Sequence, residues 1–284
     1  MPRDLIPPHL MPQVAEPPNF GQLALLIAAI AFFVVGGVIS LSRIRFEKSW
    51  SRIAAKACFW SGVSTAVAVL IWHAIVRNTW IPLDDNFEAF IWLGVMLALF
   101  VMYVQRTRPI GGLDWFIMPI VILLLGAAVI FGSARPHDYV RGTWNWVHRV
   151  SAYGGAVAFA IAAAVGAMYL ITNRRLRVKT AVPGPNLGSL ERLEHVTIAA
   201  VTLGFALLTV GAVTGFVQMV FDHRATPTSK IVLTICVWIV YGVVLHSPIN
   251  PSFRGRRTAM LSIVGFVLMV SVLVAVQFVP SRTP

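Results

Sequence analysis

Four of the seven histidines lie on apolar stretches, where an ionisable side chain needs an explanation: His73, His148, His195 and His246. Burying such a group in a membrane is costly, so its presence suggests a function by default. Neutral imidazole is a common ligand of metal ions and of haem iron. By predicted depth, His73 and His148 lie near the outer ends of their helices, and His195 and His246 near the inner ends. A pair of histidines at one depth could ligate a haem iron from both faces.

Each histidine also has a simpler interpretation. A single histidine near the end of a membrane helix is commonly an interfacial polar residue, and this interpretation is favoured for His195 and, less strongly, for His73. His137 and His223 are expected in solvated outer loops, and His9 in the N-terminal tail. His73 is therefore nominated as a ligand on its depth alone.

Tryptophans gather at the same outer edge. They are Trp72, Trp80, Trp92, Trp144 and Trp146. Aromatic side chains normally collect at membrane interfaces, so an aromatic belt is the favoured interpretation. The alternative is a flat, apolar platform for a porphyrin, which the two tryptophans just before His148 favour.

Motifs for other kinds of chemistry are missing from the sequence. No HExxH, GxSxG, Walker loop, CxxC or CxxCH occurs. The sequence therefore contains no motif typical of a zinc site, an acyl-transfer site, a nucleotide site or a thiol-redox site. Cys58 and Cys236 are predicted at different depths, about 20 Å apart by helical rise, which is too far for a disulfide. No acidic residue is evident in the middle of an apolar run, which argues against a proton-coupled carrier.

Membrane helices must position these residues. Apolar types make up 57% of the 284 residues and charged types only 12%, against about 25% charged in a soluble domain. Apolar runs of about 20 residues predict helices that cross the bilayer. These runs lie at 21–42, 57–77, 88–105, 113–133, 146–172, 195–221, 230–247 and 258–279. The expected fold is an all-α membrane protein, a bundle of about eight transmembrane helices over residues 21–280 after an extended, proline-rich arm at 1–20.

The net charge of +12 comes from short basic clusters between the apolar runs. Alternate loops hold 15 of the 23 basic residues: Arg43, Arg45, Lys48, Arg52, Lys56, Arg106, Arg108, Arg174, Arg175, Arg177, Lys179, Arg192, Arg254, Arg256 and Arg257. Short basic loops stay in the cytoplasm, so both termini are predicted to be non-cytoplasmic. This pattern indicates a multi-pass protein of the cell inner (plasma) membrane, and it accounts for the charge without a nucleic-acid partner.

An ordered set of motifs runs from about residue 80 to 280. In chain order it comprises the segment DNFEAF at 85–90, Pro119, His148 with Ser151-Ala152-Tyr153, LERLE at 190–194, Gly204-Phe205, Leu208-Thr209, Gly211, Thr214-Gly215, Lys230, Trp238, Tyr241, Leu245, His246, Arg254-Gly255-Arg256-Arg257 and Gly265-Phe266. Together these motifs resemble the cytochrome c assembly family, the group that contains CcsA, CcmC and HemX.

The resemblance implies haem b bound between helices, with His148 as the outer ligand and His246 as the transmembrane ligand. His73, nominated on depth, joins them as a candidate ligand of the haem iron. The implied function lies in cytochrome c maturation, where haem is held or delivered at the outer face for attachment to apocytochrome c. The implied partners are haem, apocytochrome c and a ResB/CcsB-type membrane protein.

The outer loop at 221–230 departs from the family pattern. CcsA- and CcmC-type chains carry a tryptophan-rich loop with a WDPK core there, whereas this chain reads FDHRATPTSK. The outer histidine that follows the last helix of CcsA-type chains is also missing. These departures favour an alternative function, a HemX-like accessory or regulator of haem biosynthesis. A small-molecule transporter is a less favoured third hypothesis, because no internal repeat is visible.

Overall fold

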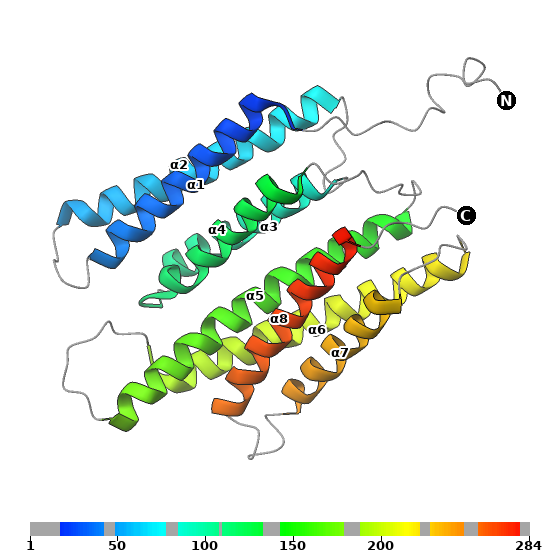
Figure 1. Ribbon diagram of the computed structural model, residues 1–284. Coiled ribbons are helices and arrows are strands. Elements are labelled where there is room, and N and C mark those ends of the chain that lie inside the picture. The colour runs from blue at the N-terminus through cyan, green and yellow to red at the C-terminus, as the bar shows by residue number, and fades with distance from the viewer. Residues whose placement is uncertain are drawn as a thin grey trace.

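The computed structural model describes residues 18–42, 49–77, 85–107, 110–132, 143–178, 188–221, 228–246 and 255–278. Within these ranges the chain forms helices and short turns, and no strand. Eight helices follow one another (Figure 1): α1 (Phe20–Ser42), α2 (Ser49–Arg77), α3 (Asn86–Thr107), α4 (Leu113–Phe131), α5 (Thr143–Val178), α6 (Leu190–Phe221), α7 (Thr228–Leu245) and α8 (Arg256–Phe278). The N-terminal arm predicted at 1–20 lies outside the described residues except for its last three.

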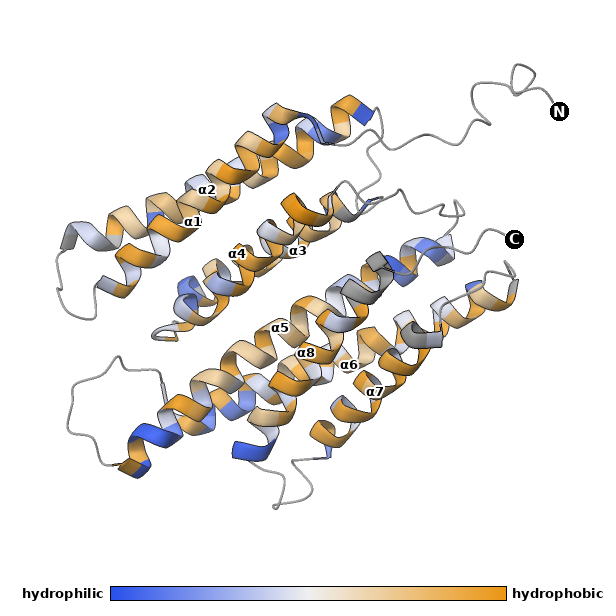
Figure 2. Ribbon diagram, viewed as in Figure 1, coloured by the Kyte–Doolittle hydropathy of each residue, from blue (hydrophilic) through white to orange (hydrophobic). Residues whose placement is uncertain are grey.

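The helices are apolar enough for a bilayer. In the described ranges, α1 to α6 each contain a stretch that could cross a membrane by length and composition, and α7 contains a shorter one at Ile231–Leu245. Figure 2 shows apolar residues along the middle of the helices and hydrophilic residues near several helix ends. The prediction of an all-α membrane protein with about eight helices is confirmed, and the orientation of the termini stays a prediction.

Several helices extend beyond the apolar runs that predicted them. The second begins at Ser49 rather than at 57, and the fifth ends at Val178 rather than at 172. Hydropathy counts only the apolar part of a helix, whereas the backbone hydrogen bonds continue into its polar ends.

Helices that follow one another in the chain mostly pack against each other. Figure 1 shows α1 beside α2, α3 beside α4, and α5 to α8 gathered in a third group. Contacts between α5 and α6 are the most extensive, and α8 packs against both α5 and α7. The fourth helix connects the groups, because it contacts α1 on one side and α5 on the other.

Polar contacts hold α1 at both of its ends. At one end, Gln22 lies beside His73 of α2. At the other, the hydroxyl of Ser40 donates to Oδ2 of Asp114 at 2.7 Å and accepts from Nε1 of Trp115 at 3.0 Å. Such bonds gain strength where water is scarce. They fix α1 along its length against α2 and α4.

A stack of rings and glycines forms the core of the third group. Phe159 of α5 and Tyr241 of α7 lie parallel, with ring centroids 3.6 Å apart. A Cβ atom at Gly204 of α6 would lie 2.5 Å from the Phe159 ring, and one at Gly265 of α8 would lie 2.7 Å from the Tyr241 ring. Both glycines are therefore required for the two rings to fit between α6 and α8. Three of these four residues belong to the motifs that indicate the family.

Candidate functional site

His148 is held against α6 by a backbone hydrogen bond. Its Nδ1 atom lies 2.7 Å from the carbonyl oxygen of Gly211. A carbonyl oxygen only accepts hydrogen bonds, so Nδ1 carries the proton and donates it. The lone pair of the neutral ring is therefore on Nε2. A protein sets the tautomer of a metal-ligating histidine in this way.

Gly215 provides the space that the His148 ring occupies. A Cβ atom at residue 215 would lie 2.9 Å from Cε1 of His148 and 3.1 Å from its Nδ1. A GxxxG step such as that from Gly211 to Gly215 is typical of close packing between membrane helices. In the structure these two glycines also hold one imidazole. The carbonyl oxygen of Gly211 accepts a hydrogen bond from the ring, and Gly215, which has no side chain, leaves room for it. We call these two residues the glycine seat.

His73 lies in a different environment, among charged side chains. Its Nε2 lies 2.9 Å from Oδ2 of Asp85, and its Nδ1 lies 3.2 Å from Oε1 of Gln22. The amide of Gln22 is oriented by a capping box, because its Oε1 accepts from the backbone N–H of Asn19 at 3.1 Å. Both ring nitrogens of His73 therefore face acceptors, which is the pattern of a protonated, positively charged imidazole.

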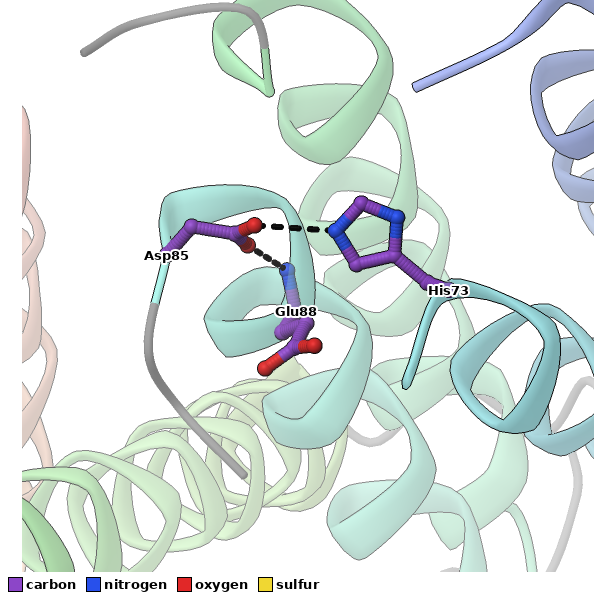
Figure 3. Close-up of side chains that lie close together, drawn as sticks. All are labelled: His73, Asp85 and Glu88. Atoms are coloured by element: carbon purple, nitrogen blue, oxygen red, sulfur yellow. Dashed lines mark hydrogen bonds and ion pairs between the residues drawn. The ribbon is translucent and has the colours of Figure 1, made fainter. Parts of the chain in front are cut away.

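Arg77 completes this cluster. Its Nη1 atom donates to Oδ2 of Asp85 at 3.1 Å and lies 3.4 Å from Oε1 of Glu88. We call His73, Arg77, Asp85 and Glu88 the His73 cluster; Figure 3 shows its two acids and its histidine. It joins the end of α2 to the start of α3, and all but Arg77 are less than 10% exposed.

The carboxylate of Asp85 is stabilised in its charged form. Burial alone would raise the pKa of Asp85. The hydrogen bonds from His73 and from the backbone N–H of Glu88, with the charges of His73 and Arg77, outweigh burial and lower the pKa from its ordinary value. The bond to the Glu88 N–H, 2.7 Å long, also caps the first turn of α3.

Ligand atoms of His73, Asp85 and Glu88 lie within 4.8 Å of one another, close enough to surround a cation. The guanidinium of Arg77 already contacts both carboxylates, so the cluster contains its own cations. To ligate iron, His73 would have to release either Asp85 or Gln22. Its role as a ligand stays a prediction, and its geometry is that of an ion-pair network.

The other two histidines on apolar stretches are His195, near the start of α6, and His246, just after α7. They lie at the end of the bundle opposite to His73 and His148. His246 follows α7 directly, is exposed, and has Nδ1 2.9 Å from the carbonyl oxygen of Gly242. His195 is 77% exposed and lies 3.9 Å from Glu191. It lines a cavity of about 650 Å³ between the end of α3 and the start of α6, which Tyr103 and Arg192 also line.

The structure gives the nominated histidines separate partners. His73 bonds to residues of α1 and the start of α3, whereas the carbonyl that accepts from Nδ1 of His148 belongs to α6. His9, His137 and His223 lie outside the described residues, as does most of the loop at 221–230. The sequence reasoning missed the pairing of His73 with Asp85. The short connection between α2 and α3 was a signal for it, because it brings the two helix ends together.

Comparisons with known proteins show which family the chain belongs to. The profile described as cytochrome C assembly protein matches residues 50–281. The inner membrane protein YpjD of Escherichia coli (strain K12) is 24% identical over 256 residues, which cover 86% of this chain and 92% of that protein. The cytochrome c biogenesis protein CcsA of Guillardia theta is 22% identical over 287 residues, covering 88% and 89% respectively.

A solved structure has the same fold. Cytochrome c heme lyase CcmF superimposes with a TM-score of 0.58 at 15% identity, over 92% of this chain and 49% of that one. This chain therefore spans about half the length of CcmF. The prediction of a multi-pass inner membrane protein is confirmed by the apolar helices and the relatives. Since the family profile covers the region from the start of α2 to the end of α8, the chain belongs to the cytochrome c assembly protein family.

Proposed function

We propose that this protein works in cytochrome c biogenesis, where it binds haem b and holds or delivers it for attachment to apocytochrome c. The observation that carries the proposal is the glycine seat of His148. A half-buried histidine is held in one tautomer by a backbone carbonyl, in a chain of the cytochrome c assembly family. That is how a protein prepares an imidazole for a metal.

The residues present fit a haem iron. With its proton on Nδ1, His148 offers Nε2, the nitrogen by which histidine commonly binds metals. The hydrogen bond to Gly211 makes the ring a stronger donor to iron, and Gly215 leaves the ring room to keep this orientation.

His246 is proposed as a second ligand at a separate position. It also has Nδ1 directed at a carbonyl oxygen, that of Gly242 in its own helix. His148 lies in the second turn of α5, whereas His246 directly follows the end of α7, and the two helices run in the same direction (Figure 1). A helix of 18 residues such as α7 is about 27 Å long, so one iron cannot contact both rings. We therefore assign them to two haem positions, one at each end of the bundle.

The chain's own part in the reaction is to bind and orient. Haem, when bound, supplies the vinyl groups to which the thiols of apocytochrome c add. The protein ligates the iron and excludes water from the buried side of the site. The proposed partners are apocytochrome c and a ResB/CcsB-type membrane protein, which would bring the thiols to the outer face.

The proposal is tested in the native host by replacing the gene with a His148→Ala variant. We expect c-type cytochromes, measured by haem staining of denaturing gels, to fall severalfold. An exposed histidine provides the control, and His195→Ala should leave them at the wild-type level. Unchanged c-type cytochromes in the His148→Ala strain would contradict the proposal.

The loop at 221–230 favours a second candidate function. It contains no tryptophan, so it lacks the aromatic surface of the tryptophan-rich family members. The candidate is a HemX-like accessory or regulator of haem biosynthesis. Altered porphyrin levels with normal c-type cytochromes, in a strain without the gene, would support this function over cytochrome c assembly.

A further inference from the structure

The cavity between the end of α3 and the start of α6 is a space that the helices leave open. In the described part of the chain both helices pack against α5, and they make little contact with each other. The cavity has a volume of about 650 Å³, which lies within the range of small-molecule sites, about 300–1,000 Å³. It is therefore large enough for a ligand.

Hydrogen bonds fix both walls of this cavity. On the α3 side, Nε2 of Gln105 donates to the carbonyl oxygen of Ile110 at 3.0 Å, which closes the turn that follows the helix. On the α6 side, the hydroxyl of Ser189 accepts from the backbone N–H of Arg192 at 3.3 Å, which caps the helix. The walls are held in place without a ligand, so the cavity is preformed.

The cavity crosses the boundary between the apolar and polar parts of its helices. The apolar run on α3 ends at about residue 105, and the one on α6 begins at about residue 195. Phe100 and Val104 line the cavity from inside the apolar run, whereas Thr107 and Arg192 line it just beyond the runs. In a membrane this is the depth at which acyl chains meet headgroups. A molecule that fills the cavity therefore needs an apolar part and a polar part.

The polar wall carries one charge of each sign. Among the described residues that line the cavity, Arg192 and Glu191 are the charged ones when histidine is neutral. Arg192 is half-buried, whereas Glu191 is 86% exposed and lies at the rim. Glu191 approaches His195 at 3.9 Å, a loose contact between two exposed side chains that contributes little. A ligand that enters from the membrane thus meets the cation deeper than the anion.

We propose that this cavity binds a phospholipid whose headgroup carries a phosphate and a primary ammonium group, as phosphatidylethanolamine does. Arg192 binds the phosphate, because its planar fork of N–H groups suits phosphate oxygens. A guanidinium has five N–H donors, so Arg192 can bind the phosphate and keep its other contacts. Glu191 accepts from the ammonium group, which lies at the tip of the headgroup.

The apolar part of the lipid would lie along Phe100 and Val104. One lipid would then join α3 to α6, the helix that carries the glycine seat, across a gap that the protein itself does not close. The charges of the headgroup follow the same order as those of the wall, since the phosphate is next to the glycerol and the ammonium group is furthest from it. A headgroup with a phosphate alone would leave Glu191 beside a second anion.

Three lipids with identical acyl chains test this proposal on full-length protein that has been purified in detergent and freed of lipid. Phosphatidylcholine keeps both charges but has no N–H donor, and phosphatidylglycerol keeps the phosphate but has no ammonium group. Native mass spectrometry gives the Kd of each lipid. We expect phosphatidylethanolamine to bind about tenfold more tightly than either of the others, the ratio expected for a charge-assisted hydrogen bond.

Variants locate the binding in this cavity. Glu191→Gln changes an exposed residue and should remove the preference for phosphatidylethanolamine. Glu194→Gln makes the same change one turn further along α6, outside the lining of the cavity, and should keep the preference. Thr107→Trp fills the cavity and should weaken the binding of all three lipids, as should Arg192→Gln.

Two results would overturn the proposal: equal binding of the three lipids by the wild type, or a preference that survives in Glu191→Gln. Glycerophosphoethanolamine, which is the headgroup without acyl chains, provides a further arm. We expect no binding of it at the same concentrations, and binding as tight as that of the lipid would instead indicate a soluble phosphate compound as the ligand. Haem ligation by His148 is independent of every one of these outcomes.

Discussion

The Nδ1 atom of His148 donates its proton to the carbonyl oxygen of Gly211 across 2.7 Å. This bond joins the second turn of α5 to the middle of α6, and it fixes which nitrogen of the ring can bind a metal. Gly215, one turn further along α6, lies so close to the ring that no side chain fits there. Two glycines of one helix thus determine the tautomer and the position of a single imidazole on another.

Gly215→Ala tests this seat directly. The added methyl would lie 2.9 Å from Cε1 of His148, so the ring must move. Overpacking of this kind costs about 1–3 kcal/mol, and we expect haem affinity to fall about tenfold. Gly126→Ala is the matched control, because a Cβ atom there has nothing within 4 Å. Equal haem affinity in both variants, measured by Soret titration, would show that the seat does not position the ligand.

Asp85→Asn tests whether the His73 cluster is structural. The substitution leaves the charges of His73 and Arg77 without one of their two carboxylates in a buried site. Breaking a buried ion pair costs about 3–5 kcal/mol, so the free energy of unfolding should fall by about that amount. Unfolding in mixed micelles provides the measurement, and the absorption spectrum of added haem should stay that of the wild type. A changed haem spectrum with unchanged stability would instead make His73 a ligand.

The lowered pKa of Asp85 predicts a particular pH dependence of stability. A carboxyl whose pKa is lower in the folded state than its ordinary 3.8 stabilises the fold above that value. This contribution is lost as the pH falls from about 4 through the lower, folded pKa, because the unfolded chain then binds the proton more readily. We expect Asp85→Asn to remove this loss. Acid titrations of the two proteins that run parallel below pH 4 would argue against it.

Gly204→Ala and Gly265→Ala test the aromatic stack. Each methyl would press on one of the two parallel rings, at 2.5 Å for Phe159 and 2.7 Å for Tyr241. We expect each substitution to lower the free energy of unfolding by about 1–3 kcal/mol. Gly37→Ala, at a position with open space around it, should be neutral or slightly stabilising. Equal stabilities of all three variants would show that the stack is loosely packed.

Much of the fold could be predicted, because hydropathy and length report directly on membrane helices. Each of the eight expected runs lies within an observed helix or extends at most two residues beyond it, and the polar ends of α2 and α5 were missed for lack of an apolar signal. The family motifs were also informative. Gly204, Tyr241 and Gly265 lie far apart in sequence and meet in one stack, so their shared pattern reflected packing.

The chemistry of the histidines was harder to predict. Predicted depth placed His73 and His148 at the same level, but the hydrogen bonds of an imidazole depend on which residues of the neighbouring helix face it. Gln22 and Asp85, the partners of His73, are 51 and 12 residues away in sequence. The spacing of Gly211 and Gly215 likewise indicates close packing, but it does not say which side chain of α5 enters the space.

The absorption spectrum of the purified protein with added haem tests whether His148 ligates haem. We expect a Soret band of ligated haem in the wild type. We also expect this band to be weakened and shifted in His148→Gly, to be partly restored by free imidazole, and to be unchanged in His195→Gly. Absence of a bound-haem Soret band in the wild type, or an identical band in His148→Gly, would contradict the claim that His148 is a haem ligand.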